Sequence, residues 1–212
     1  MKVVAINGSP RAEGNTRFAL DLVCSQLTAA GIDSEVVQVG HLPLHGCTGC
    51  GRCRKNKDEC CSLPDDGVNA IIAKMKEADG IVLGSPVYFS GIAGTMKCFL
   101  DRAFYVAGSN GGLFRTKVGA AVVALRRSGA VATFDQLNHY LNYAEMLVPS
   151  SNYWNALHGA KPGESAGDAE GVQVMEVLGR NLAWLLGLVK AGREASVEPP
   201  PAEAKVRTNF IR

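Results

Sequence analysis

Short β-branched segments alternate with segments of helical periodicity along this chain, and this alternation constrains the fold more than any single motif does. The first segment, KVVAIN, is almost continuously apolar, as expected for a parallel strand that is buried on both faces. Parallel strands need crossover connections, and these are usually helices. The pattern therefore predicts an α/β fold with a parallel sheet covered by helices on both faces.

Five strands and five helices are expected. The strands lie at Lys2–Asn7, Ser34–Val39, Gly80–Gly84, Lys117–Leu125 and Met146–Val148. The helices lie at Thr16–Ala30, Val68–Ala78, Ala93–Val106, Ala132–Glu145 and Glu170–Lys190. Five parallel strands suit the order 2-1-3-4-5, in which ligands bind beyond the carboxyl ends of the strands. With 212 residues and 47% hydrophobic composition, the chain fits one compact domain over residues 1–195, including a cysteine-rich loop at 43–64, followed by an extended tail at 196–212.

Charge and hydropathy argue against two classes of partner. A net charge of +2, with basic runs as short as Arg126-Arg127, leaves no basic face for a nucleic acid. No apolar stretch approaches the roughly 20 residues that span a bilayer, so no membrane partner is expected. The apolar run Val3–Ile6 is shorter than the core of a signal peptide, which predicts a cytoplasmic protein. In that reducing compartment the seven cysteines are not expected to form structural disulfides.

The first loop, GSPRAEGNT, joins the first strand to the first helix. A helix start offers unpaired N–H groups and about half a positive charge, which favours an anion such as a phosphate. Ser9, Arg11, Asn15 and Thr16 add hydroxyl, guanidinium and amide groups that can bond phosphate oxygens. The loop matches neither G-x-x-x-x-G-K-[ST] nor G-x-G-x-x-G, which argues against a nucleoside triphosphatase and a standard dinucleotide fold. The alternative is an ordinary helix capped by Asn15 or Thr16.

Two further loops are predicted at the same edge of the sheet. The third strand leads into GSPVYFSG, where a proline and two glycines form a tight turn and Tyr88 and Phe89 offer aromatic surface. A flat heterocycle with polar edges, such as flavin, would use both features. After the fourth strand, LRRSGA places Arg127 where a cation can stabilise a reduced flavin, the alternative being a solvated side chain. In the intervening helix, Asp101 and Arg102 are expected to be a surface or structural pair.

The segment CTGCGRCRKNKDECC holds five of the seven cysteines. Cys47, Cys50 and Cys53 have the C-x2-C-x2-C spacing typical of iron–sulfur ligation, and Cys60 or Cys61 can supply a fourth thiolate to a 4Fe–4S cluster. We take Cys60 as that ligand. Two alternatives stay open: a zinc ion, which usually uses two separated cysteine pairs, and reduced or redox-active thiols without metal. The two remaining cysteines lie on amphipathic helices and are expected to be buried and inert.

Together these segments resemble the NAD(P)H-dependent FMN reductase branch of the flavodoxin-like superfamily. The likeness runs nearly end to end, through GSPRAEGNT, the cysteine loop with its following DDG, ADGIVLGSPVYFSGIAGTMKCFLDR, VALRRSGA, NYWNALHG, DAEGVQVMEVLGRNLAWLL and TNFIR. The cysteine spacing is similar to that of the iron–sulfur flavoproteins, a subgroup whose 4Fe–4S cluster lies close to FMN. The resemblance implies a flavodoxin-like fold, FMN bound by three loops, and a homodimer or homotetramer.

The resemblance also implies roles for individual residues. It implies contacts to the FMN phosphate from Ser9, Arg11, Asn15 and Thr16. It implies contacts to the ring from Pro86, Val87, Tyr88 and Phe89, with Arg127 and Gly129 nearby. Tyr153, Trp154, Asn155, His158 and Gly159 are expected near a flavin, either the chain's own or that of a neighbouring subunit.

The function predicted from these features is that of an FMN-dependent oxidoreductase. Electrons would come from NAD(P)H or a ferredoxin-like donor and pass to a quinone, a flavin or another acceptor, by way of a 4Fe–4S cluster where one is bound. Hydride transfer needs no acid–base residue, and none is assigned. The expected partner is a small-molecule acceptor or a redox protein. The alternatives are an electron-transfer flavoprotein without substrate turnover and a redox or metal sensor. No 2′-phosphate pocket is legible, so NADH and NADPH stay equally open.

Overall fold

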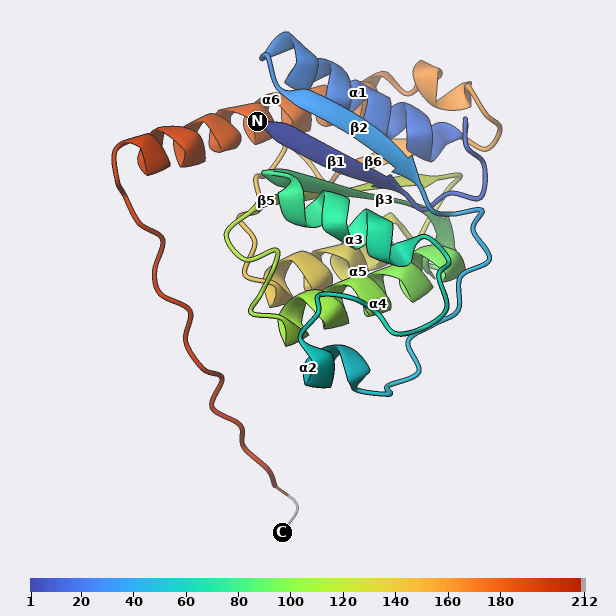
Figure 1. The fold of residues 1–212 in the computed structure, drawn as a ribbon. Helices are drawn as coiled ribbons and strands as arrows, with labels where there is room; N and C mark the ends of the chain where they lie inside the picture. Colours follow the sequence, from blue (N-terminus) through green and yellow to red (C-terminus); the bar gives the residue numbers. More distant parts are fainter. Residues whose placement is uncertain (211–212) are drawn as a thin grey trace.

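A parallel sheet forms the centre of the protein in the computed structural model, which describes residues 1–210 (Figure 1). Its strands are β1 (Lys2–Asn7), β2 (Asp33–Gln38), β3 (Gly80–Tyr88), β5 (Val118–Leu125) and β6 (Ala156–His158). They lie in the order β2-β1-β3-β5-β6, and every neighbouring pair is parallel. β4 (Gly91–Ile92) forms a short antiparallel hairpin with the end of β3. Counted among the parallel strands alone, this is the predicted order 2-1-3-4-5, and the flavodoxin-like α/β fold is confirmed.

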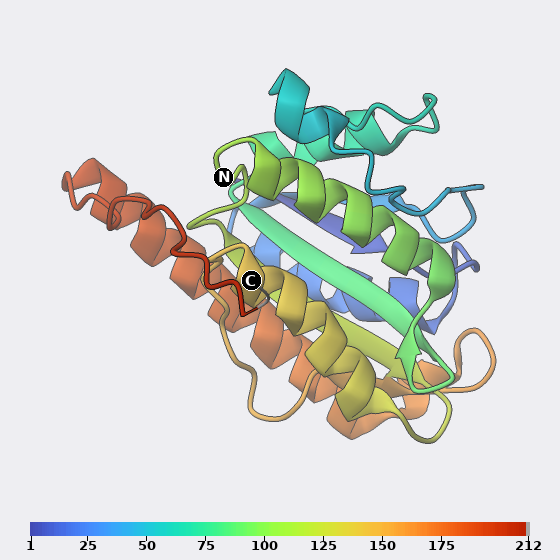
Figure 2. The same cartoon turned by 90° about the horizontal axis from the view of Figure 1, so that it is seen from below.

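Helices cover both faces of the sheet (Figures 1 and 2). On one face α1 (Asn15–Ala29) packs against α6 (Ala169–Glu194). The other face is covered by α3 (Val68–Glu77), α4 (Gly94–Ser109) and α5 (Ala130–Tyr143). The short helix α2 (Arg52–Asn56) lies outside this layer, against α4, and the 3-10 helix η1 (Glu164–Gly167) precedes α6.

β1 shows why the strands are apolar on both sides. Val3 and Ala5 belong to the core beneath α1 and α6, whereas Val4 and Ile6 belong to the core beneath α3 and α4. Successive side chains of a strand point to opposite faces, so a strand covered on both faces needs apolar residues throughout. All four are fully buried, and each buried valine or isoleucine contributes about 1.5–3 kcal/mol of transfer free energy.

The predicted fifth strand at Met146–Val148 is wrong. Of these residues, Leu147 alone pairs with the sheet, in an isolated bridge to Val118. The edge strand is β6, which follows later in the chain and pairs with the end of β5. Met146 is buried and packs beside Gly119, so its apolar character serves the core rather than a strand. β6 reads ALH and has no β-branched side chain, so its sequence carries little strand signal.

The last helix, α6, is the one described helix long and apolar enough, by length and composition, to cross a membrane. Its buried side chains include Val174, Leu178, Leu182 and Leu186, which pack in the core beneath α1. A helix that forms part of such a core passes the same test of length and composition.

Residues 198–210 form no helix or strand and extend away from the domain as an exposed tail (Figure 1). The tail contacts the domain near its start, where Arg115 Nη2 donates to the Pro200 carbonyl at 2.8 Å, and again at Lys205, whose Nζ lies 3.8 Å from the centre of the Tyr143 ring. Of the predicted tail at 196–212, the last two residues lie outside the described part of the chain.

Candidate functional site

A cavity of about 180 Å³ lies at the carboxyl ends of the parallel strands. Four segments line it: Ser9, Pro10, Arg11, Gly14, Asn15 and Thr16 after β1; Pro86, Val87 and Tyr88 at the end of β3; Ala124, Leu125 and Arg126 at the end of β5; and Gly159 and Ala160 after β6. The fold thus brings the predicted phosphate loop and most of the predicted ring loop to one crevice, at the edge where open α/β sheets bind ligands.

The start of α1 suits an anion. Gly14 occupies the N-cap position, and no side chain of residues 1–210 caps this helix. Asn15 and Thr16 are instead the first residues of the helix, so the alternative that one of them is an ordinary cap does not hold. The first turn carries no acidic residue, and its partial positive charge faces the crevice uncompensated. The Arg11 backbone N–H donates to Ser9 Oγ at 3.1 Å, which closes the loop around the helix start.

Two buried polar atoms beside this cavity, Asn15 Oδ1 and Ser165 Oγ, have no hydrogen-bond partner within the described chain. Buried polar groups are almost always bonded, so these atoms fit a polar ligand. Gly159 lies against both residues: a Cβ there would come within 2.8 Å of Asn15 Nδ2 and of the Ser165 backbone nitrogen. Only glycine allows this close approach without displacing the residues that line the phosphate end of the crevice.

The ring loop begins inside the sheet. β3 continues past its predicted end because Pro86 stays in register with Ala124 of β5. Tyr88, about half exposed, then forms part of the cavity wall. The hairpin turn that follows places Phe89 and Ser90 at φ values of 48° and 59°, a conformation uncommon for residues other than glycine. The Phe89 side chain is fully exposed on this turn and is not among the residues that line the cavity.

The third loop packs directly on the ring loop. Gly129 has a φ of 91°, and a Cβ there would lie 2.9 Å from Val87 Cγ1 and from Ser90 Cα. Glycine is therefore required both for the backbone conformation and for the contact between the two loops. The predicted Arg127 is exposed and does not line the cavity, whereas its neighbour Arg126 does.

The segment after α5 splits between two places. Gly159 lines the crevice described above, but Tyr153 and Trp154 line a neighbouring groove of about 500 Å³ along α5. Their rings meet edge to face, with centroids 4.5 Å apart, and both are at least half exposed. Asn155 is buried and donates to the Ala121 carbonyl at 2.9 Å, which anchors the segment to β5.

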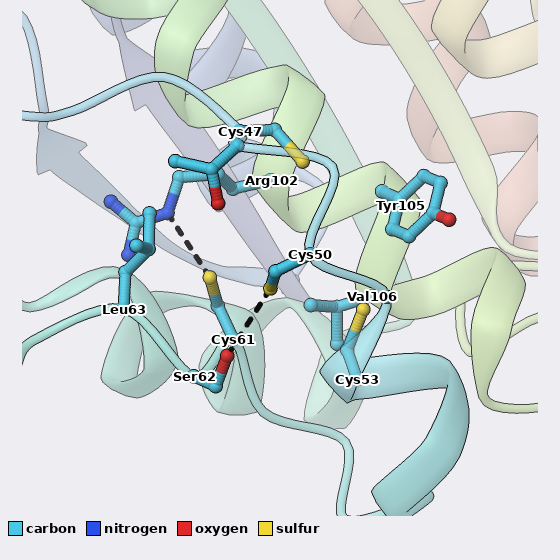
Figure 3. A pocket seen from close by; sticks show the side chains of 11 residues that line it. Cys47, Cys50, Cys53, Cys61, Ser62, Leu63, Arg102, Tyr105 and Val106 are labelled. Atoms are coloured by element: carbon cyan, nitrogen blue, oxygen red, sulfur yellow. Dashed lines mark hydrogen bonds between the residues drawn. The ribbon is translucent and has the colours of Figure 1, made fainter.

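A second cavity brings cysteines together from both arms of the cysteine-rich loop (Figure 3). Cys47, Cys50, Cys53 and Cys61 line it, together with Arg102, Tyr105 and Val106 of α4. Cys60, the predicted fourth ligand, is not one of its lining residues, whereas Cys61 is. All seven cysteines are free thiols. Cys24 and Cys98 are partly buried rather than fully enclosed.

Specific bonds hold the cysteine loop in shape. Gly49 and Gly51 have φ values of 66° and 69°, which let the chain turn between the first three cysteines. Asn69 of α3 fixes Cys61 at two points: its Oδ1 accepts from the Cys61 N–H at 2.8 Å and its Nδ2 donates to the Cys61 carbonyl at 2.9 Å. Asn110 accepts from the Glu59 N–H at 3.2 Å and so ties the second arm to the end of α4.

The thiols differ in acidity. Hydrogen bonds from the Arg52 backbone N–H and from the Ser62 hydroxyl lower the pKa of Cys50 to about 7. Burial raises the pKa of Cys53 above its ordinary value. Cys50 is exposed, so its thiolate is both available to solvent and substantially populated at neutral pH.

Arg102 was expected to pair with Asp101, and that expectation is wrong. Asp101 instead accepts from Lys97 and from the Tyr140 hydroxyl on the outside of α4. Arg102 points inward, is 1% exposed, and forms a two-point ion pair with Asp66, one bond of which measures 3.0 Å. Its Nε also donates to the Cys61 sulfur at 3.4 Å (Figure 3).

Among residues 1–210, no three histidine, cysteine, aspartate or glutamate side chains converge closely enough to hold a single metal ion. A structural zinc site needs four ligands within about 2.3 Å of one ion. In a 4Fe–4S cluster each cysteine binds a separate iron, so the four sulfurs surround a larger body. Four thiols spread around one cavity suit the second requirement better than the first.

A model of the NADPH-dependent FMN reductase family matches residues 1–161. This range includes every residue that lines the crevice and every residue that lines the cysteine cavity. The chain belongs to this family. The predicted resemblance is confirmed, and the chain is a flavin-dependent oxidoreductase that uses FMN.

Comparison with sequence relatives identifies the subgroup of the family to which this chain belongs. An iron–sulfur flavoprotein of Methanocaldococcus jannaschii is 36% identical over 197 residues, which cover 90% of this chain and 100% of that protein. The chain therefore falls in the iron–sulfur flavoprotein subgroup. An NAD(P)H:quinone oxidoreductase from Methanothermobacter marburgensis has a TM-score of 0.63 at 18% identity, covering 86% of this chain and 96% of that one. A flavodoxin from the domain Archaea has a TM-score of 0.58 at 16% identity, with coverages of 88% and 99%. These two structures share the fold.

Several residues of this flavoprotein's sites were not found from its sequence. Arg126 could not be separated from Arg127, because two adjacent arginines in a loop give no directional signal. Ser165 lies in a segment without periodicity. Arg102 did carry a usable signal: it lies three residues after Phe99 and four before Val106, both buried, so helical periodicity places it on the inner face of α4.

Proposed function

We propose that this chain passes electrons from NAD(P)H or a ferredoxin-like donor to a quinone, a flavin or another acceptor, using FMN together with a 4Fe–4S cluster. The observation that carries the proposal is the presence of two separate cavities, one with the groups that suit a phosphorylated ring and one lined by four cysteines. The family supplies the flavin chemistry, and the second cavity supports the cluster.

For FMN, the phosphate is assigned to the start of α1. Ser9, Arg11, Asn15 and Thr16 would hold it, together with the N–H groups of the first turn. The isoalloxazine ring is assigned to the ring loop, through Pro86, Val87 and Tyr88, with Arg126 at the end of β5 and Gly129 on the loop that packs against it. The predicted contacts from Phe89 and Arg127 are not retained, because neither side chain lines the cavity. When bound there, FMN would supply the exchange between two-electron and one-electron chemistry, and these residues would hold and orient it.

For the cluster, Cys47, Cys50, Cys53 and Cys61 would be the ligands. Cys61 replaces Cys60 in the assignment because Asn69 and Arg102 hold it towards the cavity. A zinc ion is the weaker alternative because the four sulfurs do not converge on one point. The alternative of redox-active thiols without a metal also has less support, since a redox-active pair needs only two cysteines and leaves the other two without a role.

α4 runs from beside the ring loop to the cysteine cavity. At its start, the Ala93 N–H donates to Ser85 Oγ, immediately before the residues of the ring loop. Further along, Arg102 and Tyr105 line the cysteine cavity. Arg102 lies eight positions after Gly94, which corresponds to a rise of roughly 12 Å at 1.5 Å per residue. Electron exchange between the two sites is therefore proposed to run along one rigid element.

The partner is proposed to be a small-molecule acceptor or a redox protein, and the assembly a homodimer or homotetramer. Exposed aromatic side chains support an assembly, since Tyr143, Tyr153, Trp154 and Trp184 are all at least half exposed. Large aromatic side chains are enriched in the buried centres of protein interfaces.

The test is an anaerobic purification followed by a visible spectrum and by assays for FMN, iron and sulfide. We expect one FMN and about four iron and four sulfide ions per chain. Cys61→Ala should lose the iron and sulfide, whereas the matched control Cys60→Ala should retain them. A protein that shows flavin bands only, with no sulfide after reconstitution, would refute the cluster. Steady-state oxidation of NADH or NADPH then separates an enzyme from an electron carrier without turnover.

A further inference from the structure

The Arg102 side chain is the largest fully buried one in the described chain. It leaves α4 towards the cysteine cavity and fills the space between the two arms of the cysteine loop (Figure 3). A guanidinium keeps its charge in proteins, so a full positive charge lies in the interior beside four thiols. Burying such a charge is unfavourable unless its partners are well placed, and an ion pair of this kind is weak evidence of a stabilising role.

The partners of Arg102 fall into two sets. Asp66 takes both terminal nitrogens of the guanidinium and balances its charge. The remaining donors bind the cysteine loop: Nη1 donates to the His45 carbonyl at 3.3 Å and Nε to the Cys61 sulfur at 3.4 Å. If the ion pair had only a structural role, Arg102 would need no partner other than Asp66. The donation to sulfur places positive charge at one of the four thiols that line the cavity.

We propose that Arg102, with Asp66 as its counter-ion, is a positioning residue that orients the Cys61 sulfur towards the cluster and raises the reduction potential of the cluster. This inference rests on the proposed function. Adding one electron to an iron–sulfur cluster makes it more negative, and no bond or proton need move. Hydrogen bonds to the ligand sulfurs and nearby charge set the potential of such clusters, because they favour the more negative state.

Because Arg102 has a counter-ion, the proposal predicts the direction in which each substitution shifts the reduction potential of the cluster. Arg102 and Asp66 carry opposite charges in one pair, so their removal should shift the potential in opposite directions. Arg102→Gln keeps a hydrogen-bond donor but removes the positive charge, which should make the cluster harder to reduce. Asp66→Asn keeps the shape and leaves the guanidinium uncompensated, which should make the cluster easier to reduce. A residue pair that only holds the loop together would not reverse sign.

The experiment is a mediated redox titration of the anaerobic holoprotein, followed by electron paramagnetic resonance of the reduced cluster. At the potential where half of the wild-type cluster is reduced, Arg102→Gln should show a ratio of reduced to oxidised cluster about tenfold lower, which corresponds to 59 mV for one electron. Asp66→Asn should show a higher ratio than the wild type. The control is Asp101→Asn, the neighbouring carboxylate on the outside of α4, which should change the ratio less than about twofold because solvent screens it.

Shifts of the same sign in both variants, or changes smaller than twofold in both, would overturn the proposal. If Arg102→Gln fails to fold, as judged by circular dichroism, Asp66→Asn and Arg102→Lys decide the outcome; Arg102→Lys keeps the charge and should retain a ratio closer to that of the wild type. A folded Asp66→Asn protein without iron would show that the pair serves only to hold the site, and would also overturn the proposal. If the wild type itself takes up no iron and sulfide, the proposed function has failed, and that result is distinct from all of these.

Discussion

Replacing Gly159 by alanine should weaken FMN binding, because this glycine lies against the phosphate end of the crevice. An added Cβ would come within 2.8 Å of Asn15 Nδ2 and of the Ser165 backbone nitrogen, and closer still to Ser165 Oγ. Real Cβ atoms do not approach other heavy atoms so closely, so Asn15 or the start of η1 must move. Overpacking of a well-packed site costs about 1–3 kcal/mol. Because Asn15 is one of the residues assigned to the phosphate, its displacement falls on the bound state, and FMN affinity should fall about 5- to 150-fold.

The assay is a titration of flavin-free protein with FMN, followed by the quenching of flavin fluorescence. Gly167→Ala is the matched control: Gly167 lies at the end of η1, and a Cβ there would meet no heavy atom within 4 Å. The double variant Gly159→Ala with Ser165→Ala should recover part of the affinity, because Ser165 Oγ is the nearest obstacle and has no partner to lose among residues 1–210. An unchanged dissociation constant for Gly159→Ala would refute the placement of the phosphate beside this residue.

Three further predictions concern the cysteine cavity and the pair beneath it. Asp66→Asn should lower the free energy of unfolding by about 3 kcal/mol in a urea titration, since it leaves Arg102 buried and uncompensated, whereas Asp101→Asn should cost less than about 1 kcal/mol. Burial acts to raise the pKa of Asp66, but bonds from Arg102 lower it below its ordinary value; the difference between wild type and Asp66→Asn should therefore be full above the unfolded-state pKa and shrink as pH falls through the folded-state pKa. Equal stability of the two proteins at neutral pH would contradict this account. In protein stripped of iron by a chelator, alkylation of Cys50 should reach half its maximal rate near pH 7, and a midpoint at pH 8.5 or above would count against the hydrogen bonds described for it.

The sequence predicted the architecture because most of its strands and helices have a strong periodicity of their own. β1 could be recognised from Val3 to Ile6, since burial on both faces demands apolar residues throughout. β6 could not, because a three-residue edge strand depends on its neighbour and not on its own propensity. Met146 misled the prediction for a related reason: a buried residue in a connection resembles a short strand.

The sites were predicted to a similar degree and with a similar limit. Residues close together in one loop could be grouped from the sequence, and Ser9, Arg11, Asn15 and Thr16 do line one cavity; their contact with FMN stays a prediction. Contacts between distant segments were not accessible: the choice between Cys60 and Cys61 depends on Asn69, which reaches back from α3, and on Arg102, which reaches across from α4. Such choices are made by packing, and sequence spacing alone does not contain them.

The central claim is that the start of α1 binds the phosphate of FMN and that the neighbouring loops bind its flat ring. Parallel titrations of the flavin-free protein with FMN and with riboflavin, which lacks the phosphate, test it most directly. We predict that FMN binds with a stoichiometry near one per chain and that riboflavin binds at least about tenfold more weakly, because charge-assisted hydrogen bonds each contribute about 1.5–3 kcal/mol. Equal affinity for the two flavins, or no binding of either, would contradict the account.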